Sequence, residues 1–239
     1  MCLTPALAAA LECKQIAVND IPASVCKVDL RADHLQLFLN DAQGKPFNTF
    51  QRLGESLQGK AEELGFAMNA GMYREDYSPL GLFVANGQQV RRLNRASGYG
   101  NFYLQPNGVF LLSDTGARVV ATAEYNSVPG PVTLATQSGP LLLQRGIINP
   151  VFDPHGTSKY VRNGVGVINA NEVVFAITDK PVNFYDFAAL FRDQLHCTDA
   201  LYLDGNVSSL YARNLGRDDE WARLGPIVAV TLPGKKPPP

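Results

Sequence analysis

The sequence predicts an α+β fold, with a twisted, largely antiparallel mixed sheet core and a few packed helices in a single domain. Two observations support this class. Gly (21 residues) and Pro (16 residues) divide the 239 residues into many short segments, most of them apolar or alternating runs typical of strands. Only two stretches carry apolar side chains at helical spacing. With 46% apolar residues, the chain is long enough to bury one sizeable core.

The predicted strands are short apolar runs bounded by turn residues. In chain order they are Ser24–Leu30, His34–Leu39, Gly65–Asn69, Gly81–Ala85, Asn101–Leu104, Val109–Leu112, Leu141–Leu143, Val165–Ile168, Val173–Thr178, Ala200–Leu203 and Ile227–Thr231.

Two helices are predicted from the spacing of apolar side chains. The first spans about Asn48–Leu64, with apolar residues at Phe50, Leu53, Leu57 and Leu64. The second spans about Phe184–Leu195, with Phe184, Phe187, Ala188, Phe191 and Leu195 on one face. Asn183 just before it and Asp186 three residues later form a helix-capping pattern, which favours a structural role for this acid.

The two ends of the chain lie outside the predicted domain, residues 11–232. Residues 1–10 are small and apolar and resemble the end of a secretory signal, although a frayed Ala-rich terminus has the same composition. Residues 233–239 end in Lys-Lys-Pro-Pro-Pro and predict a disordered, extended tail.

The cysteines favour export. Cys13 and Cys26 flank a segment that reads as two short strands, so a hairpin disulfide is expected between them in an oxidising compartment. Cys197 is expected to be a buried small hydrophobe, because no basic cluster surrounds it. We therefore expect a periplasmic or secreted protein.

Charge and hydropathy exclude several classes of partner. The net charge of -1, with interspersed signs, gives no field for steering nucleic acid. No apolar run approaches the roughly 18 residues that a membrane span requires. The sequence does not specify an oligomeric state.

Four segments place small and amide residues beside a short apolar strand, where a scaffold usually presents ligand-binding groups. They are Met68–Met72, Gln137–Pro140, Arg162–Gly166 and Asp199–Ser209. In the last, Asp204 stands at the mouth of a strand and Gly205 lets a ligand approach the backbone. The alternative is an Asp-Gly hairpin turn with a solvated Asp.

The ordered motifs resemble the phosphodiester glycosidase family, in particular its short, exported bacterial branch. They are Asn-Ala-Gly-Met (69–72), Ser-Pro-Leu-Gly-Leu (78–82) with Asn86-Gly87, Gly-Asn-Phe (100–102), Ala-Thr-Gln-Ser-Gly-Pro-Leu-Leu (135–142), Arg-Asn-Gly-Val-Gly (162–166) and Ala-Leu-Tyr-Leu-Asp-Gly-Asn-Val-Ser-Ser (200–209). The resemblance spans about Val25 to Val230. Many relatives read Asp-Gly-Gly-x-Ser where this chain has Asp204-Gly205-Asn206-Val207-Ser208.

The resemblance implies hydrolysis of a sugar 1-phosphodiester, which releases the sugar and a phosphate monoester. Arg162 is expected to hold the phosphate with a bidentate fork, although a salt bridge to a neighbouring acid is the commoner use of such an arginine. Asp204 is expected to face the anomeric carbon as base, nucleophile or electrostatic partner.

Further residues of these segments are expected to bind the phosphorylated carbohydrate substrate. Side chains that could contact sugar or phosphate are Asn69, Gln137, Ser138, Asn163, Asn206 and Ser208, and backbone amides could approach at Gly71, Gly139 and Gly205. Taken singly, each such glycine is more simply a turn residue.

Two other functions stay open at the level of sequence. One is a protein that binds or matures a phosphorylated exopolysaccharide without cleaving it, which would tolerate an outward-facing Asp204. The other is a metal-dependent phosphodiesterase, which requires clustered acids. No dedicated metal site or other cofactor is predicted, because His34, His155 and His196 lack metal-ligand spacing. A divalent cation loosely held by carboxylates and carbonyls stays compatible with the sequence.

Overall fold

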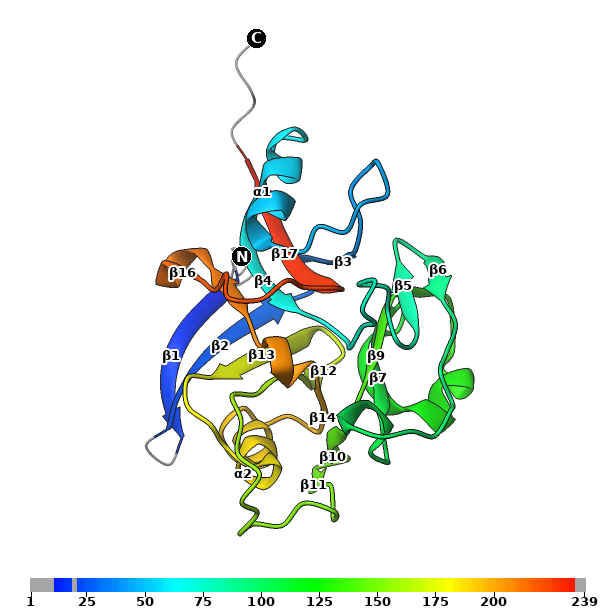
Figure 1. Cartoon of the computed structure of the whole chain (residues 1–239), viewed down its shortest axis with the longest axis vertical. Coiled ribbons are helices and arrows are strands. Elements are labelled where there is room, and N and C mark those ends of the chain that lie inside the picture. The colour runs from blue at the N-terminus through cyan, green and yellow to red at the C-terminus, as the bar shows by residue number, and fades with distance from the viewer. Residues whose placement is uncertain (1–10, 19–20, 235–239) are drawn as a thin grey trace, which may run out of the picture.

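The computed structural model describes residues 11–18 and 21–234, and in this part the strands form three antiparallel sheets (Figure 1). The seven-stranded sheet has the order β1 (Glu12–Val18), β2 (Ile21–Asp29), β13 (Glu172–Thr178), β12 (Asn163–Asn169), β14 (Asp199–Tyr202), β10 (Leu141–Gln144), β11 (Ile147–Ile148). The first five-stranded sheet has the order β16 (Arg217–Asp218), β15 (Leu210–Ala212), β4 (Glu62–Asn69), β17 (Ile227–Pro233), β3 (His34–Phe38). The second has the order β6 (Gln88–Arg91), β5 (Phe83–Ala85), β9 (Val132–Ser138), β7 (Gly108–Ser113), β8 (Gly116–Ala121). The α+β class is confirmed, with three sheets around a common core.

One phenylalanine from each sheet meets at the centre of that core. The ring of Phe175 in β13 lies 4.9 Å from that of Phe66 in β4 and 5.9 Å from that of Phe110 in β7. All three side chains are buried. The three sheets therefore pack as a single domain, since none of them can bury its apolar face alone.

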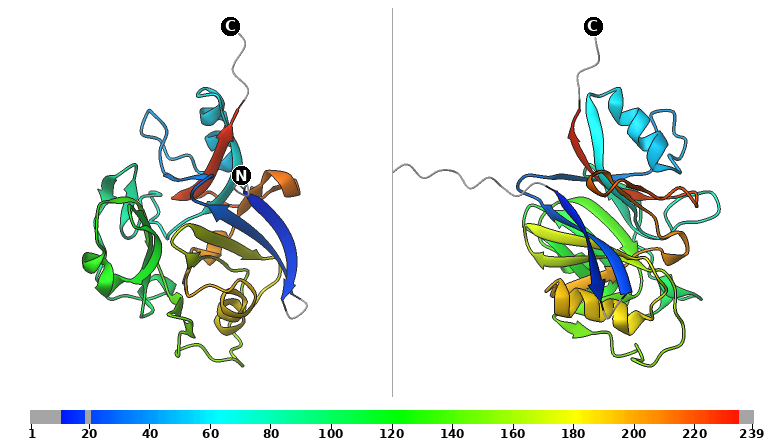
Figure 2. Two further views of the ribbon diagram at one scale, coloured as in Figure 1. Left: turned by 180° about the vertical axis from the view of Figure 1, so that it is seen from behind. Right: turned by 90° about the vertical axis from the view of Figure 1, so that its left-hand side faces the viewer.

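The two helices cover the outer faces of two sheets (Figure 2). Strand β13 shows the consequence for the sequence: Val173 and Phe175 face the central core, whereas Val174 packs in the cluster beneath α2 (Phe184–Ala189). Because both faces of this strand are covered, its sequence reads as a continuous apolar run rather than an alternating one.

The first helix, α1 (Phe50–Gln58), is shorter than predicted. Thr49 caps it by accepting a hydrogen bond from Arg52 N, and its buried face packs on the β4–β17 sheet. The helix ends at Gly59, and Leu64 belongs to β4, where it pairs with Thr231 of β17. Pairing along β4 therefore overrides the apolar spacing that suggested a longer helix.

The second predicted helix is confirmed. It begins at Phe184 with Asn183 as its cap, whose side chain accepts a hydrogen bond from Asp186 N at 2.7 Å. A short π-helical segment, Leu190–Gln194, completes it. This hydrogen bond agrees with the predicted capping pattern, in which Asp186 has a structural role at the start of α2.

One predicted strand is wrong. The segment Asn101–Tyr103 forms a turn of 3-10 helix that buries Phe102, and Leu104 N donates to Asn101 O. Asn107 Nδ2 donates to Phe102 O at 2.8 Å, so this carbonyl is bound by a side chain and not by a neighbouring strand. Three further 3-10 segments are Thr122–Ser127, Gly205–Val207 and Arg213–Leu215.

The structure joins Cys13 to Cys26 by the expected disulfide, across directly paired positions of β1 and β2. Cys197 is buried among apolar side chains, and burial raises the pKa of its thiol to about 12. Residues 1–10, 19–20 and 235–239, which include the expected signal remnant and most of the expected tail, lie outside the described residues, and β17 includes Pro233. Within the described ranges no helix is long and apolar enough to cross a membrane.

Candidate active site

Two asparagines at the ends of strands in different sheets bind each other and hold the loop that carries Asp204. Asn163, the first residue of β12, donates from Nδ2 to Oδ1 of Asn69, the last residue of β4, at 2.9 Å. Asn69 Nδ2 in turn donates to the backbone oxygen of Asp204 at 2.8 Å, and its Oδ1 also accepts from Ser209 N. Ser208 Oγ donates to Asn163 Oδ1 at 3.2 Å. The segments around residues 69, 163 and 204 therefore meet, as the sequence predicted.

The direct sugar contacts expected of Asn69, Asn163 and Ser208 are not available in this arrangement. All three side chains are almost fully buried, and their polar groups bind protein. Their part is to fix the loop between the seven-stranded sheet and the β4–β17 sheet.

Asp204 follows the end of β14 and begins the 3-10 turn Gly205–Val207. Its Oδ1 accepts a hydrogen bond from Asn206 N at 3.2 Å. The strands on either side, β14 and β15, belong to different sheets, so the segment is not the hairpin turn considered as an alternative. Burial raises the pKa of the Asp204 carboxyl above its ordinary value, and the bond from Asn206 opposes this only in part.

Gly205 lies directly over the hydroxyl of Tyr202. A Cβ atom at position 205 would fall 1.8 Å from the Tyr202 oxygen, so a side chain there would force this loop off the ring. Tyr202 is buried, and burial raises the pKa of its hydroxyl. The positive charge of Arg162 opposes that rise and the negative charge of Asp204 adds to it, which places both charges near one phenol.

Arg162 is buried, with 1% of the residue's surface exposed, and packs among aromatic rings rather than acids. Its guanidinium carbon lies 3.5 Å from the ring centroid of Phe184 and 5.5 Å from that of Tyr202. Nε donates to Val182 O at 2.8 Å and Nη2 to Ser158 O at 3.0 Å. No salt bridge involves Arg162 among residues 11–18 and 21–234, so the ion pair considered as an alternative is not its role there.

Two of the three guanidinium nitrogens of Arg162, which we expected to bind phosphate, therefore already donate to the protein. The third, Nη1, has no partner. In the described part of the chain, two buried side-chain polar atoms have no hydrogen-bond partner: Nη1 of Arg162 and Oγ of Ser138. Both residues belong to the set that the sequence singled out. A buried donor without a partner is costly, which makes such atoms candidates for contact with a ligand.

The segment around Ser138 joins the same region through backbone contacts. Gly71 N donates to Thr136 Oγ1 at 3.1 Å, and a Cβ at position 71 would lie 2.4 Å from Gln137 O. Pro140 O accepts from Tyr202 N at 3.1 Å. The glycine at 71 is thus required because the loop after β4 passes close to β9, which brings the fourth segment beside the other three.

Gln137 has a structural role instead of the expected substrate contact. Its Oε1 accepts from Leu82 N and Asn94 N, and its Nε2 donates to Asn94 O and Thr122 Oγ1. Both polar atoms of the Gln137 amide therefore bind protein groups, and they attach the loop that carries Asn94 to β9. Gly139 is likewise packed, because a Cβ there would lie 2.7 Å from Phe102 O. Of the predicted polar side chains, Asn206 is the exposed one.

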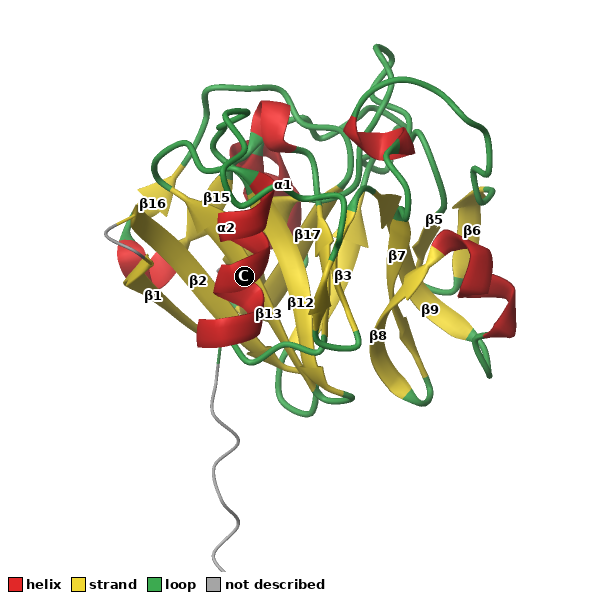
Figure 3. Ribbon diagram, turned by 90° about the horizontal axis from the view of Figure 1, so that it is seen from below, coloured by secondary structure: helices red, strands yellow, loops and turns green. Residues whose placement is uncertain are grey.

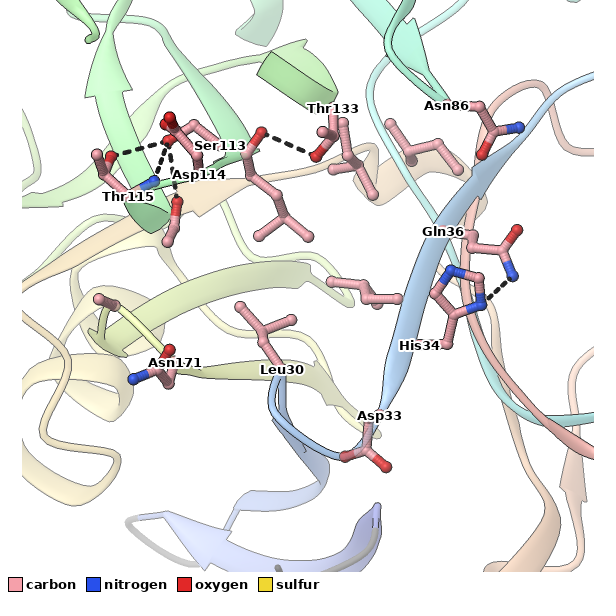
Figure 4. Close-up of a pocket in the computed structure, with 16 residues that line it drawn as sticks. Leu30, Asp33, His34, Gln36, Asn86, Ser113, Asp114, Thr115, Thr133 and Asn171 are labelled. Atoms are coloured by element: carbon pink, nitrogen blue, oxygen red, sulfur yellow. Dashed lines mark hydrogen bonds between the residues drawn. The ribbon is translucent and has the colours of Figure 1, made fainter. Parts of the chain in front are cut away.

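A cavity of about 550 Å³ lies away from these residues (Figure 4). Its lining includes Thr133 at the start of β9 and Asn171 just after β12, whereas Ser138 and Asn163 stand at the other ends of the same strands. At about 3.3 Å per residue, the length of β12 separates the two regions by roughly 20 Å. Figure 3 shows long loops gathered at one end of the strands and shorter turns at the other. We base the candidate site on the converging side chains rather than on this hollow.

Residues 11–18 and 21–234 contain no group of three or more His, Cys, Asp or Glu side chains able to hold a metal ion. The clustered acids required by the metal-dependent phosphodiesterase alternative are therefore not gathered in those ranges. Asp76 accepts hydrogen bonds from Ser78 N and Oγ, as an exposed turn acid does.

Comparison with known proteins settles the family. A sequence model of the phosphodiester glycosidase family matches residues 62–228. The chain belongs to the phosphodiester glycosidase family. It is 32% identical over 233 residues to the uncharacterized protein YigE of Escherichia coli (strain K12), a match that covers 98% of this chain and 90% of that protein.

Two solved structures share the fold of this phosphodiester glycosidase family member. One is the catalytic domain of zebrafish N-acetylglucosamine-1-phosphodiester alpha-N-acetylglucosaminidase, auto-inhibited by its pro-peptide. It has a TM-score of 0.66 and 14% identity, over 96% of this chain and 85% of that one. The other is a hypothetical protein from Synechocystis, with a TM-score of 0.55 and 14% identity, over 93% of this chain and 62% of that one.

Sequence reasoning missed the aromatic residues of the site. Tyr202 and Phe184 enclose the Arg162 guanidinium, and Tyr73 lies near Asp204, whose charge adds to the effect of burial in raising the pKa of Tyr73 to about 12. In the sequence, Tyr202 and Phe184 belong to an apolar strand and an apolar helix face, where aromatic residues are ordinarily core. No spacing signal distinguishes them from core residues.

Proposed function

We propose that this chain hydrolyses a sugar 1-phosphodiester in a cell-envelope or secreted glycan, and that Asp204 and Arg162 carry the reaction. Family membership supports a glycosidase that acts on phosphodiesters. One observation supports the assignment of these two residues: Nη1 of the buried Arg162 has no hydrogen-bond partner, and no acid pairs with this arginine. The Arg162 guanidinium lies close to the ring of Tyr202, and the loop that carries Asp204 packs on the hydroxyl of the same tyrosine.

In the proposed reaction, the bond between the anomeric carbon and the phosphate oxygen breaks. Its electron pair leaves with the phosphate monoester, water supplies the new anomeric hydroxyl, and the proton of water is released. Positive charge develops on the sugar ring, and the Asp204 carboxylate faces it. Burial disfavours the ionised carboxylate in the free protein, and a cationic ring beside it reverses that preference. Product stereochemistry then decides whether Asp204 attacks carbon directly or activates water.

Arg162 supplies positive charge for the departing phosphate. Its bonds to Val182 O and Ser158 O and its stacking on Phe184 fix the guanidinium before substrate binds. A preorganised cation in a water-poor site stabilises a developing anion more than a mobile one does. The leaving phosphate has a second pKa of about 6, so a strong general acid is not required.

We also propose that the protein works in an oxidising compartment, the periplasm or the exterior. The support is the Cys13–Cys26 disulfide, because such bonds persist outside the reducing cytosol. The reaction as proposed uses no organic cofactor.

The test is hydrolysis of a panel of glycosyl 1-phosphodiesters in water enriched in ¹⁸O. Cleavage at the anomeric carbon places the label on the released sugar and leaves the phosphate monoester unlabelled. Label in the phosphate would instead show attack on phosphorus, as in a phosphodiesterase. Saturable binding of the panel without turnover would favour the alternative of a glycan-binding protein.

A further inference from the structure

The buried hydroxyl of Tyr202 lies near both charged groups to which the reaction is assigned. The chain stays extended beyond β14: Leu203 N donates to Asn163 O at 3.0 Å, and Asp204 has φ -102° and ψ 101°. Leu203 packs in the central core, whereas Tyr202 packs in the cluster beneath α2. Because side chains alternate along an extended chain, Tyr202 and Asp204 point to the same side.

Aromatic packing fixes the ring of Tyr202 beside the Arg162 guanidinium. The ring meets that of Phe184 edge to face, with centroids 4.9 Å apart and an angle of 84° between the planes. The same Phe184 ring takes the guanidinium on its face, at 3.5 Å from the centroid. Gly205 packs directly on the phenol oxygen. The hydroxyl is therefore held in place before a ligand binds.

The groups that approach the phenol oxygen are hydrogen-bond donors. Burial raises the pKa of the Tyr202 hydroxyl, whereas the charge of Arg162 and hydrogen bonds from the Gly205 N–H and the guanidinium lower it. A donor cannot accept the proton of the hydroxyl, so this O–H needs an acceptor elsewhere. Asp204 acts on the same pKa through its charge alone, and its Oδ1 accepts from Asn206 N. Within the described part of the chain, the O–H is thus a donor still available to a ligand, as is Nη1 of Arg162.

We propose that Tyr202 is a further catalytic residue, whose hydroxyl donates a hydrogen bond to the same phosphate that Nη1 of Arg162 binds. This inference rests on the proposed function and adds a group to its reaction. The guanidinium carbon is 5.5 Å from the Tyr202 ring centroid, and the guanidinium contacts the phenol oxygen. A phosphate bound at Nη1 therefore has the hydroxyl beside it.

The hydroxyl stabilises the leaving group and keeps its own proton. A phosphodiester carries one negative charge and the departing phosphate monoester carries about two, so the hydrogen bond strengthens as the anomeric bond breaks. The leaving oxygen keeps the electron pair of that bond, and water supplies the new anomeric hydroxyl. Burial raises the pKa of both Tyr202 and Asp204. Between the two values the phenol is neutral and can donate while the carboxylate is ionised.

The first test replaces Tyr202 by Phe, which keeps the ring that packs on Phe184 and removes the hydroxyl. For the best panel substrate, kcat should fall about 100-fold with KM within about threefold of the parent, because the lost hydrogen bond is stronger in the transition state. Tm should stay close to that of the parent. Tyr125→Phe is the matched control: burial raises the pKa of this tyrosine too, but it packs against the sheet that contains β7 and β9. Its kcat and KM should not change.

A second test distinguishes donation to phosphate from a structural role of the hydroxyl. A ring-fluorinated tyrosine in place of Tyr202 has nearly the same shape and a more acidic phenol. An ionised phenol cannot donate and repels phosphate, so the alkaline fall in kcat/KM should move to lower pH than in the parent. A phenol that only accepts from the Gly205 N–H would lose nothing on ionisation. Arg162 and Asp204, the charged groups that act on this phenol, are the same in both proteins, so the shift reports on position 202.

The outcomes separate this inference from the proposed function. If the parent cleaves the panel at the anomeric carbon, two results would show that Tyr202 is not catalytic and leave the function standing. One is a kcat of Tyr202→Phe within about threefold of the parent, and the other is an unchanged pH profile in the fluorinated protein.

If no panel compound is hydrolysed, the ¹⁹F NMR signal of the fluorinated protein decides. A saturable change with a glycosyl 1-phosphodiester, but not with the free sugar, would support the contact between Tyr202 and phosphate while the hydrolytic function falls. An equal change with the free sugar, or no change with any panel compound, would overturn the contact.

Discussion

Replacement of Asp204 by Asn should abolish turnover and at the same time make the protein more stable. Asn retains the shape of the side chain and an oxygen that accepts from Asn206 N, so the 3-10 turn after β14 is preserved. It removes the negative charge that the reaction needs. We expect kcat to fall by about 10³-fold or more, the range for loss of a group that handles charge or protons in the transition state.

The expected gain in stability follows from the direction of the pKa shift. Burial raises the pKa of the Asp204 carboxyl, so the folded protein binds its proton more tightly than the unfolded chain does. Stability from this group is present below the unfolded pKa and is lost as the pH rises through the folded value. At pH 7 the ionised carboxylate therefore opposes folding. Asn removes that penalty, and we expect a gain on the order of 1 kcal/mol, or roughly 3 °C in Tm for a chain of this size.

The matched control is Asp41→Asn. The Oδ1 atom of Asp41 also accepts a backbone hydrogen bond from two residues on, from Gln43 N at 3.0 Å, but it lies on an exposed loop and pairs with Arg52. This variant should keep full activity and lose at most about 1 kcal/mol. The assay is thermal unfolding with turnover of the best panel substrate. A lower Tm in Asp204→Asn would show that the buried carboxylate does not oppose folding, and activity within tenfold of the parent would show that Asp204 is not catalytic.

Three further predictions concern the same site. Arg162→Lys should lower kcat at least about 100-fold and cost about 3 kcal/mol, because an ammonium cannot bind Val182 O and Ser158 O together; full activity at 20 °C below Tm would remove Arg162 from the mechanism. Asn69→Ala should reduce activity and lower the free energy of unfolding by about 2–4 kcal/mol, since it removes the side-chain hydrogen bonds to Asp204 O, Asn163 Nδ2 and Ser209 N; a variant as stable as the parent would contradict the loop-holding role. The acid limb of kcat/KM should lie above the ordinary carboxyl pKa of 3.8, because Asp204 must be ionised and burial raises its pKa; a limb at or below that value in a pH-rate profile would contradict the assignment.

The strands were largely predictable because most carry a strong local signal. Val173–Thr178 is an apolar run rich in β-branched residues between turns, and the structure has β13 at these positions. The 3-10 turn at Asn101–Tyr103 was not predictable in this way, since its burial of Phe102 depends on tertiary contacts. For the same reason the end of α1 was misplaced, because pairing of Leu64 with β17 is not visible in the sequence.

For the site, the sequence indicated which segments meet but not what each side chain does. Asn69 and Asn163 were expected to bind substrate, and the structure shows them bonded to each other. An amide that holds a loop and one that holds a sugar have the same local sequence, and only their distant partners distinguish them. The exposure of Trp221 was not predictable for a related reason, since it depends on the whole fold.

The paired roles of Asp204 and Arg162 are tested most directly by the structure of the Asp204→Asn variant with an intact glycosyl phosphodiester bound. We expect a phosphate oxygen within hydrogen-bond distance of Nη1 of Arg162 and the anomeric carbon beside the side chain at position 204. Phosphate bound elsewhere, for example in the cavity beside Asn171, would contradict it.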